Sequence, residues 1–287
     1  MTAASPGNVK GVRRPMRHVL PWTAAGFFLV VQLAPLLWIV AASFKTPAKI
    51  AAGPSYALPA HLDIGNYVRA FQTSNLPLYI WNSAVVAFLT ITLTVVLAAP
   101  AAFGIEKLRF PGSRQVLSYF LLGLMIPVFV ALLPMFQAFS RLGLRDSYWS
   151  VVLPQVAFNL PMALYVYTGF MRAIPDALLE AAMVDGAGWF KIFTSIVVPL
   201  SVNATITIAV FNFMFVWNEF VFANTFLTST AVKTLPVGLN DFVGQYGGQD
   251  LGAIYAAIVV SIIPTILLYL FLNARVIEGM TAGAVRG

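Results

Sequence analysis

Long runs of apolar residues alternate with short polar links along almost the whole chain. An α-helix rises about 1.5 Å per residue, so each run is long enough to cross the roughly 30 Å hydrocarbon core of a bilayer. The pattern predicts an all-α, polytopic membrane protein with six spanning helices. They are expected at residues 20–42, 79–103, 116–139, 151–171, 193–222 and 252–273.

The same pattern divides the chain into three parts. We expect an N-terminal tail at 1–18, one membrane domain at 19–273 and a C-terminal tail at 274–287. The link at about 172–200 joins the fourth and fifth runs and is expected to be cytosolic, together with both tails. The first run follows basic residues, as in a signal peptide, but it is too long for one, so we predict an uncleaved first helix.

Two features modify a straight six-helix picture. The fifth run is longer than one crossing needs, so we expect it to be tilted or to begin as a separate cytosolic helix. Proline is tolerated in membrane helices where neighbours satisfy the freed carbonyls, so the internal prolines predict kinks rather than breaks. These prolines are Pro35, Pro127, Pro134, Pro161 and Pro264.

Composition supports a lipid environment. Only 9% of the 287 residues are charged and 60% are hydrophobic, too few charges to cover the surface of a water-soluble globule. The net charge of +7 lies in short clusters beside the apolar runs, where it fixes membrane orientation, so we expect no nucleic-acid partner. The absence of Cys excludes disulfides, thiolate metal sites and Cys nucleophiles.

Basic residues also predict the orientation. With the N-terminus in the cytoplasm, 11 of the 17 Lys and Arg residues lie inside, which favours both termini inside, although Arg141 and Arg145 dissent. Two long segments, at 43–78 and 223–251, then lie outside. Segments of this length either contact a partner or substrate or serve as mobile connectors, and the sequence leaves both alternatives open.

The link between the fourth and fifth runs carries the most specific signals. Pro175 suits the first helical position, and Asp176 and Glu180 place negative charge near the positive end of the helix dipole. Gly186 can adopt the left-handed conformation that ends a helix. The segment therefore predicts a helix of about three turns, a turn, and a second helix that enters the membrane.

The spacing of residues on that first helix suggests a binding role. Leu179, Ala182 and Met183 share one face, and the small side chains of Ala181 and Ala182 allow another surface to approach closely. A short amphipathic helix of this kind suits insertion into a groove on a soluble partner. The alternative is a helix that only lies at the membrane surface.

The spacing of this link resembles a known family pattern. Glu180-Ala181-Ala182, three residues, Gly186, nine residues, Ile196, one residue and Pro199 is similar to the EAA loop of ABC-importer membrane subunits, with Val198 in place of the usual Leu. The run at 217–228 and the tail at 279–287 resemble the second membrane subunit of maltose-type carbohydrate importers. The likeness covers nearly the whole chain.

The resemblance implies a type I ABC-importer (MetI-like) permease fold in a bacterial cytoplasmic (inner) membrane. It further implies a second homologous permease subunit, two ATPase subunits and an extracytoplasmic sugar-binding protein, which the segment 229–251 contacts. The ATPase-docking residues that it implies are Glu180, Ala181, Ala182, Met183, Asp185, Gly186 and Pro199, with Gly279, Thr281 and Gly283 of the tail also near the ATPases.

The chain has no visible catalytic apparatus. It contains no Gly-x4-Gly-Lys-Ser/Thr motif, so we expect ATP and Mg to be bound by partner ATPase subunits and no cofactor to be bound here. His18 and His61 lie outside the runs, away from any cluster of acids that would support a metal site or acid–base chemistry. We therefore predict a subunit that is not an enzyme.

A few polar residues within the runs are candidates for a substrate path. Amides, carboxylates and aromatic faces suit a neutral sugar, and an acid at membrane depth indicates a path or a buried partner. The candidates are Trp217, Asn218, Glu219, Gln155 and Asn159. The alternative is that such side chains join helices by hydrogen bonds, which we favour for Asn82 and Asn203.

The sequence favours one function over two alternatives. The leading hypothesis is a carbohydrate permease subunit that works by alternating access, with ATP hydrolysis in other subunits moving the Glu180 helix. The alternative is an ion-gradient-driven secondary transporter or channel, for which Glu219 is meagre support. An intramembrane enzyme would need a nucleophile with a base or clustered metal ligands, and the sequence shows neither.

Overall fold

A computed structural model describes residues 19–54, 57–59, 61–72, 74–244 and 250–284. Every regular element among them is a helix, as the apolar pattern predicts. The predicted N-terminal tail, with Lys10 and His18, lies outside the described residues.

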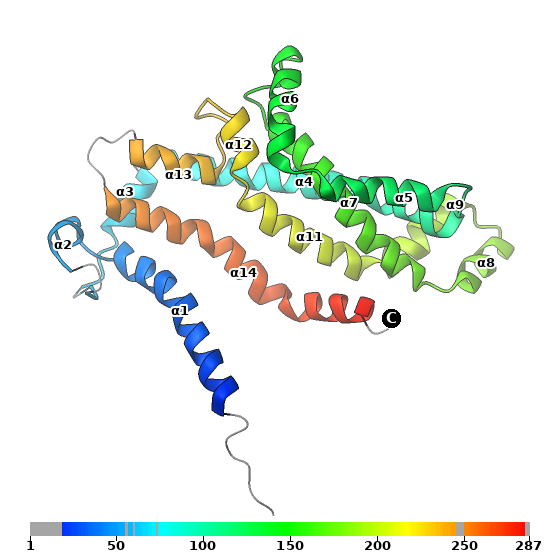
Figure 1. Ribbon diagram of the computed structural model, residues 1–287, viewed down its shortest axis with the longest axis horizontal. Coiled ribbons are helices and arrows are strands. Elements are labelled where there is room, and N and C mark those ends of the chain that lie inside the picture. Colours follow the sequence, from blue (N-terminus) through cyan, green and yellow to red (C-terminus); the bar gives the residue numbers. More distant parts are fainter. Residues whose placement is uncertain (1–18, 55–56, 60, 73, 245–249, 285–287) are drawn as a thin grey trace, which may run out of the picture.

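Five long helices form the body of the molecule (Figure 1). They are α1 (Val19–Ser43), α4 (Leu76–Phe103), α7 (Tyr148–Arg172), α11 (Val202–Trp217) and α14 (Leu251–Ala284). Helices α4, α7, α11 and α14 run along the long axis of the molecule, and α1 leaves the bundle obliquely. By length and composition the described part of the chain has four membrane-spanning candidates, or up to six if each of two bent helix pairs is one span.

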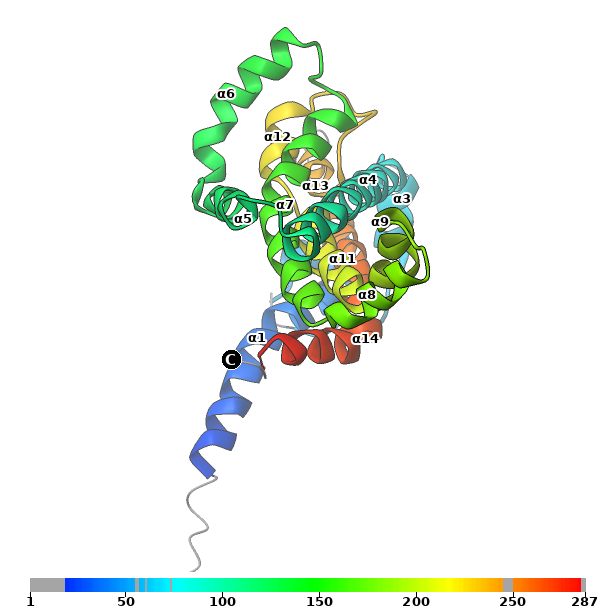
Figure 2. The same cartoon turned by 90° about the vertical axis from the view of Figure 1, so that its right-hand side faces the viewer.

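The third apolar run forms one of those bent pairs. Helices α5 (Ser113–Leu122) and α6 (Val128–Arg141) meet at 96°, so the expected kink at Pro127 is wrong and the helix breaks there. Ile126 has extended backbone because the ring of the following proline disfavours the helical conformation for the residue before it. Figure 2 shows the pair as an arm beside the bundle.

The other four internal prolines lie inside helices, as expected. They are Pro35, Pro134, Pro161 and Pro264.

The fifth run is also broken. Residues Trp189–Leu200 form short helices that meet α11 at 67°, so the alternative of a separate leading helix is confirmed. At its other end the expected single span is wrong, since α11 stops at Trp217 and a separate helix, α12, covers Val221–Phe226. The run stays largely apolar across the 67° bend, so the hydrophobic pattern did not reveal it, whereas the break after Trp217 falls at the polar pair Asn218-Glu219.

Helices α4 and α7 form the centre of the bundle through small and large apolar residues. Ala98 and Ala102 of α4 and Ala163 of α7 are buried in one cluster with Tyr167, whose ring is fully covered. Small residues allow membrane helices to approach closely. The hydroxyl of Tyr167 also lies 2.8 Å from that of Thr205, which joins α7 to α11.

The links at one end of the bundle are folded against it; we call this the outer end. They include the short helices α2 (Pro47–Ala52), α3 (Gly65–Gln72) and α13 (Leu235–Gly244). The amide nitrogen of Asn66 donates to the backbone oxygens of Ser43 and Lys45, at 2.6 and 2.8 Å.

Two longer-range contacts complete the outer end. Arg69 pairs with Asp250 at 2.7 Å, and the Tyr79 hydroxyl donates to Asp241 at 2.8 Å. The described parts of both long outer segments are therefore held on the bundle, which argues against the mobile-connector alternative, and contact with a partner or substrate stays a prediction.

The close approach of Gly238 to Tyr79 gives a test of this packing. A Cβ atom at Gly238 would overlap the Tyr79 ring, so Gly238→Ala should lower stability by about 1–3 kcal/mol. Gly169→Ala is the matched control because no atom lies within 4 Å of its added Cβ. Thermal unfolding in detergent should show a lower midpoint for Gly238→Ala alone; equal midpoints for both variants and the parent would contradict the packing.

Candidate functional site: the helix at residues 176–184

The predicted cytosolic helix is present as α8 (Asp176–Val184), at the end of the bundle opposite α3 and α13; we call this the inner end (Figure 1). Pro175 precedes the helix with extended backbone, one residue earlier than the expected first helical position. Its carbonyl accepts a hydrogen bond from the Leu178 amide at 3.2 Å. The helix therefore starts where the sequence indicates, within one residue.

Gly186 ends α8 as expected. Its φ of +81° is left-handed, a conformation that glycine adopts without steric cost. The Gly186 amide donates to the Met183 carbonyl at 3.0 Å, and the Ala187 amide donates to the Ala182 carbonyl at 2.9 Å. These two bonds make a Schellman motif, which satisfies the last carbonyls of the helix and fixes the turn that follows.

The two faces of α8 have different surroundings. Leu179 is only 3% exposed, and Ala182 and Ala187 pack against the same core cluster of the bundle. The face that Leu179 and Ala182 share is thus directed at this chain's own bundle. Glu180, Ala181 and Val184 are exposed on the opposite side, and we call these three residues the free face of α8.

The remaining predicted docking residues lie around this helix. Met183, Asp185 and Gly186 are exposed at its end, and Pro199 is exposed in α10 (Val198–Leu200). Gly279, Thr281 and Gly283 fall in the last turns of α14, which runs on through Ala284 instead of ending at 273. Docking by all of these residues stays a prediction.

A buried lysine fastens the beginning of α8 to the bundle. Lys107 lies in a short π-helix, η2 (Gly104–Leu108), that continues α4. Its ammonium donates to the Ile174 carbonyl at 2.6 Å and to the Asp176 carboxylate at 2.7 Å. The Lys107 side chain is only 1% exposed, so a charge that would be costly without partners is fully compensated.

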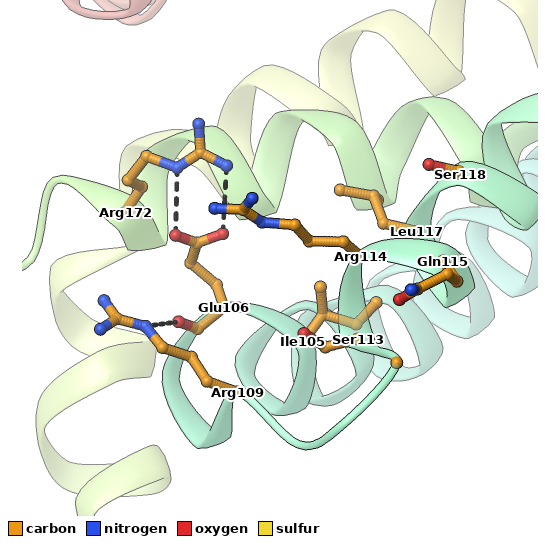
Figure 3. Close-up of a pocket in the computed structure, with 10 residues that line it drawn as sticks. Ile105, Glu106, Arg109, Ser113, Arg114, Gln115, Leu117, Ser118 and Arg172 are labelled. Carbon is orange, nitrogen blue, oxygen red and sulfur yellow. Dashed lines mark hydrogen bonds and ion pairs between the residues drawn. The ribbon is translucent and has the colours of Figure 1, made fainter.

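Two further ion pairs reinforce the same junction. Arg172, the last residue of α7, donates through Nε and Nη2 to Glu106 at 3.0 and 3.2 Å (Figure 3). Arg109 donates to the second oxygen of Asp176 at 2.9 Å. We call Glu106, Lys107, Arg109, Arg172 and Asp176 the junction network. It ties the end of α4 to both sides of the link between α7 and α8.

The junction network also sets the titration of Asp176. The hydrogen bond from Lys107, followed by its charge and that of Arg109, lowers the pKa of Asp176 below its ordinary value of 3.8. A carboxyl whose folded pKa is lowered contributes stability above its ordinary pKa, and that contribution is lost as the pH falls through the lowered value. The Asp176 carboxyl is therefore ionised at neutral pH.

The junction network was not predicted from the sequence. Lys107, Arg109 and Arg172 were included there only among the 11 basic residues that indicate the membrane orientation. The available signal was the adjacent Glu106 and Lys107 at the end of an apolar run, where charge is costly unless it is paired.

Trp217, Asn218 and Glu219 lie together at the outer end of α11, but each forms hydrogen bonds within the protein. The Trp217 indole donates to the Ser261 carbonyl at 2.9 Å, which ties α11 to α14, and Asn218 is exposed and donates to Met214. The Glu219 carboxylate accepts amide hydrogen bonds at 2.7 and 3.1 Å from the first turn of α12. Roles for these three in a substrate path stay predictions.

The two path candidates on α7 are more enclosed. Gln155 is 3% exposed, and neither of its amide atoms has a hydrogen-bond partner among the described residues. Asn159 is half-buried one turn later. The expectation for Asn82 is confirmed, because its amide joins α4 to the backbone of residues 231 and 233 and to the Tyr148 hydroxyl, whereas Asn203 is exposed.

An all-helical bundle with several helices long and apolar enough to cross a membrane, carrying at one end a fastened helix with an exposed face, is the architecture of a polytopic membrane protein. A family model described as "Binding-protein-dependent transport system inner membrane component" matches residues 94–281. The chain belongs to this family. It is an integral inner-membrane protein and a non-catalytic subunit of a transport system, with the MetI-like permease fold.

Individual relatives cover most of the chain. It is 32% identical over 258 residues to the diacetylchitobiose uptake system permease protein of Streptomyces coelicolor, covering 90% of this chain and 85% of that one. It is 32% identical over 275 residues to the trehalose/maltose transport system permease protein of Thermococcus litoralis, covering 95% and 98%.

A solved structure shares the fold. The chain matches one from a bacterial ABC transporter involved in the import of the acidic polysaccharide alginate, with a TM-score of 0.78 and 20% identity. The match covers 89% of this chain and 95% of the other.

Removal of the buried lysine tests the junction network. Lys107→Met leaves the Ile174 carbonyl and Asp176 without their shared donor, so amides of α8 should exchange hydrogen about tenfold faster, while those of α11 stay unchanged. Lys191→Met, which changes an exposed lysine on α9 (Trp189–Ile192), is the matched control. Hydrogen exchange with mass spectrometry is the measurement, and unchanged exchange in α8 would contradict the assignment.

Proposed function

We propose that this chain is one of two permease subunits of an ABC importer that carries a carbohydrate across the inner membrane. The observation that carries the proposal is α8, a helix that is fastened to the bundle on one side and free on the other. ATPase subunits outside the membrane need a segment of this kind in order to move the bundle. Membership of the family shows that the chain is a component of a binding-protein-dependent transport system.

The carbohydrate class rests on relatives. Permeases at 32% identity with near-complete coverage are named for diacetylchitobiose and for trehalose and maltose. These are neutral sugars rich in hydroxyl groups. An oligosaccharide or a similar polyol is the substrate class that we propose for this chain.

ATP would act from outside this chain. The sequence has no phosphate-binding P-loop, so we propose that two ATPase subunits bind ATP and Mg and seat the free face of α8 in a cleft. Glu180 is the charged residue of that face, and Val184, 88% exposed, is its apolar contact. The inner end of the bundle then faces the cytoplasm, as the basic residues predict.

A second, homologous permease would complete the pathway. None of residues 21–41 of α1 is buried, and none of the residues of α5 or α6 is buried. Large side chains such as Phe129 and Leu133 are 73% and 65% exposed. Lipid and a partner bundle together would cover these apolar faces.

The outer end suits contact with an extracytoplasmic sugar-binding protein. The described residues of the segment 229–251 lie there, and they are held by Lys233, which pairs with Asp241 at 2.8 Å, and by the contacts of Asn82. A partner that binds at this end would contact an ordered surface, so little conformational entropy would be lost on binding.

The junction network suggests how movement reaches the pathway. When the ATPases close, they displace α8, and the ion pairs of the junction network pass that displacement to α4 and α7 together. The bundle then rocks against its partner and opens to one side of the membrane at a time. An ion-driven transporter is less well supported, because Glu219 caps α12 beyond the end of α11.

Reconstitution tests the proposed class. Proteoliposomes that contain the complete complex should take up sugar only when ATP is present on the side of the membrane where the ATPase subunits lie. Proteoliposomes that contain this chain alone should take up none. Uptake by the chain alone, driven by an ion gradient and insensitive to ATP, would refute the proposal.

A charge reversal tests the docking face. Glu180→Lys should release the ATPase subunits, reducing their co-purification and the ATP-driven uptake about tenfold or more, while the bundle stays folded because Glu180 is exposed. Gln72→Lys, at an exposed position of α3 on the outer end, is the control for added charge. If Glu180→Lys retains both ATPase attachment and uptake, Glu180 does not belong to the docking surface.

A further inference from the structure

A basic cleft of about 790 Å³ lies at the inner end, between the link from α4 to α5 and the end of α7. Its lining includes Arg109, Arg114, Arg172, Glu106, Ser113 and Gln115 (Figure 3). Three guanidinium groups against one carboxylate give this lining a net charge of +2.

The three arginines differ in what they bind. Arg172 is engaged by both oxygens of Glu106, and Arg109 donates to Asp176. Arg114 makes no hydrogen bond or ion pair with any described residue, and Figure 3 shows its side chain extending into the cleft toward Glu106 and Arg172. Because one guanidinium is unpaired and the other two are only partly neutralised, the cleft can bind an anion.

The chemistry of the lining favours a phosphate ester. Guanidinium groups match the oxygens of a phosphate with pairs of N–H donors, and the neutral side chains of Ser113 and Gln115 add further donors. A carboxylate ligand would use fewer of these groups.

The surroundings favour a lipid as the source of that phosphate. The cleft opens where α5 begins, and the same helix continues with exposed apolar residues, among them Tyr119 (74%) and Leu122 (59%). Phe110, also exposed, lies beside the cleft in the link. A headgroup in the cleft would therefore have an apolar surface for its acyl chains along α5. Basic pockets between membrane helices on the cytoplasmic side bind anionic headgroups in this way.

We propose that this cleft binds the phosphate headgroup of an anionic phospholipid, with Arg114 as its principal ligand. The bound anion also lies beside Arg109 and Arg172 of the junction network, so it stabilises the α4–α5 link against α7. The proposal does not depend on the transported substrate or on the ATPase.

Lipid retention tests the site. The complete complex is exchanged from nanodiscs of phosphatidylcholine with phosphatidylglycerol into detergent, and phosphatidylglycerol bound per chain is counted by mass spectrometry. Arg114→Gln should bind it about fivefold more weakly, and Arg114→Lys should recover part of the loss. Arg141→Gln, an exposed arginine at the far end of the α5–α6 pair, is the matched control and should behave as the parent.

Competition with inorganic phosphate distinguishes a lipid headgroup from soluble phosphate as the ligand of the cleft. Retention that excess phosphate does not reverse supports a lipid ligand. Displacement by phosphate, again only where Arg114 is present, supports the same anion site with a soluble phosphate as its ligand. Equal phosphatidylglycerol retention by the parent, Arg114→Gln and Arg141→Gln, with no effect of phosphate, would overturn the proposal.

Discussion

One interaction holds α8 in place, the pairing of the buried Lys107 ammonium with the Ile174 carbonyl and Asp176. A charge with only 1% of its side chain exposed is tolerated because both partners are within 2.7 Å. The start of α8 therefore has one favoured position relative to α4. Around this contact, Arg172 and Glu106 hold the end of α7 in the same way, so three elements meet at one ionic junction.

This arrangement explains how α8 can have two roles. Leu179 and the turn at Gly186 hold it on the bundle, while Glu180 and Val184 remain available to another protein. A helix held only by its apolar face could slide when pulled, but the junction network resists sliding because its hydrogen bonds are directional. The π-helical end of α4 places Lys107 in the interior, where a regular turn would direct it elsewhere.

The features that could be predicted from the sequence are those that depend on residues close together in the chain. Apolar runs identified the spans, and Gly186 and the spacing from Glu180 to Pro199 identified α8, because helix ends and motifs depend on neighbouring residues. The 96° break before Pro127 was missed because hydrophobicity reports burial in lipid and not direction. Lys107 and Asp176 are 69 residues apart, so no local pattern joins them. Trp217 and Glu219 suited a sugar path chemically, yet both make contacts that serve packing and capping.

Helices α8 and α4 should move as one body, and a distance measurement can show whether they do. The chain has no Cys, so spin labels can be attached to Leu178→Cys on α8 and Val96→Cys on α4 without background from the rest of this chain. Both positions are exposed. Pulsed electron–electron resonance on the complete complex should give one distance distribution that is the same without nucleotide and with bound ATP. A distribution that shifts or splits when ATP binds would show that α8 moves independently of α4, and would contradict the account.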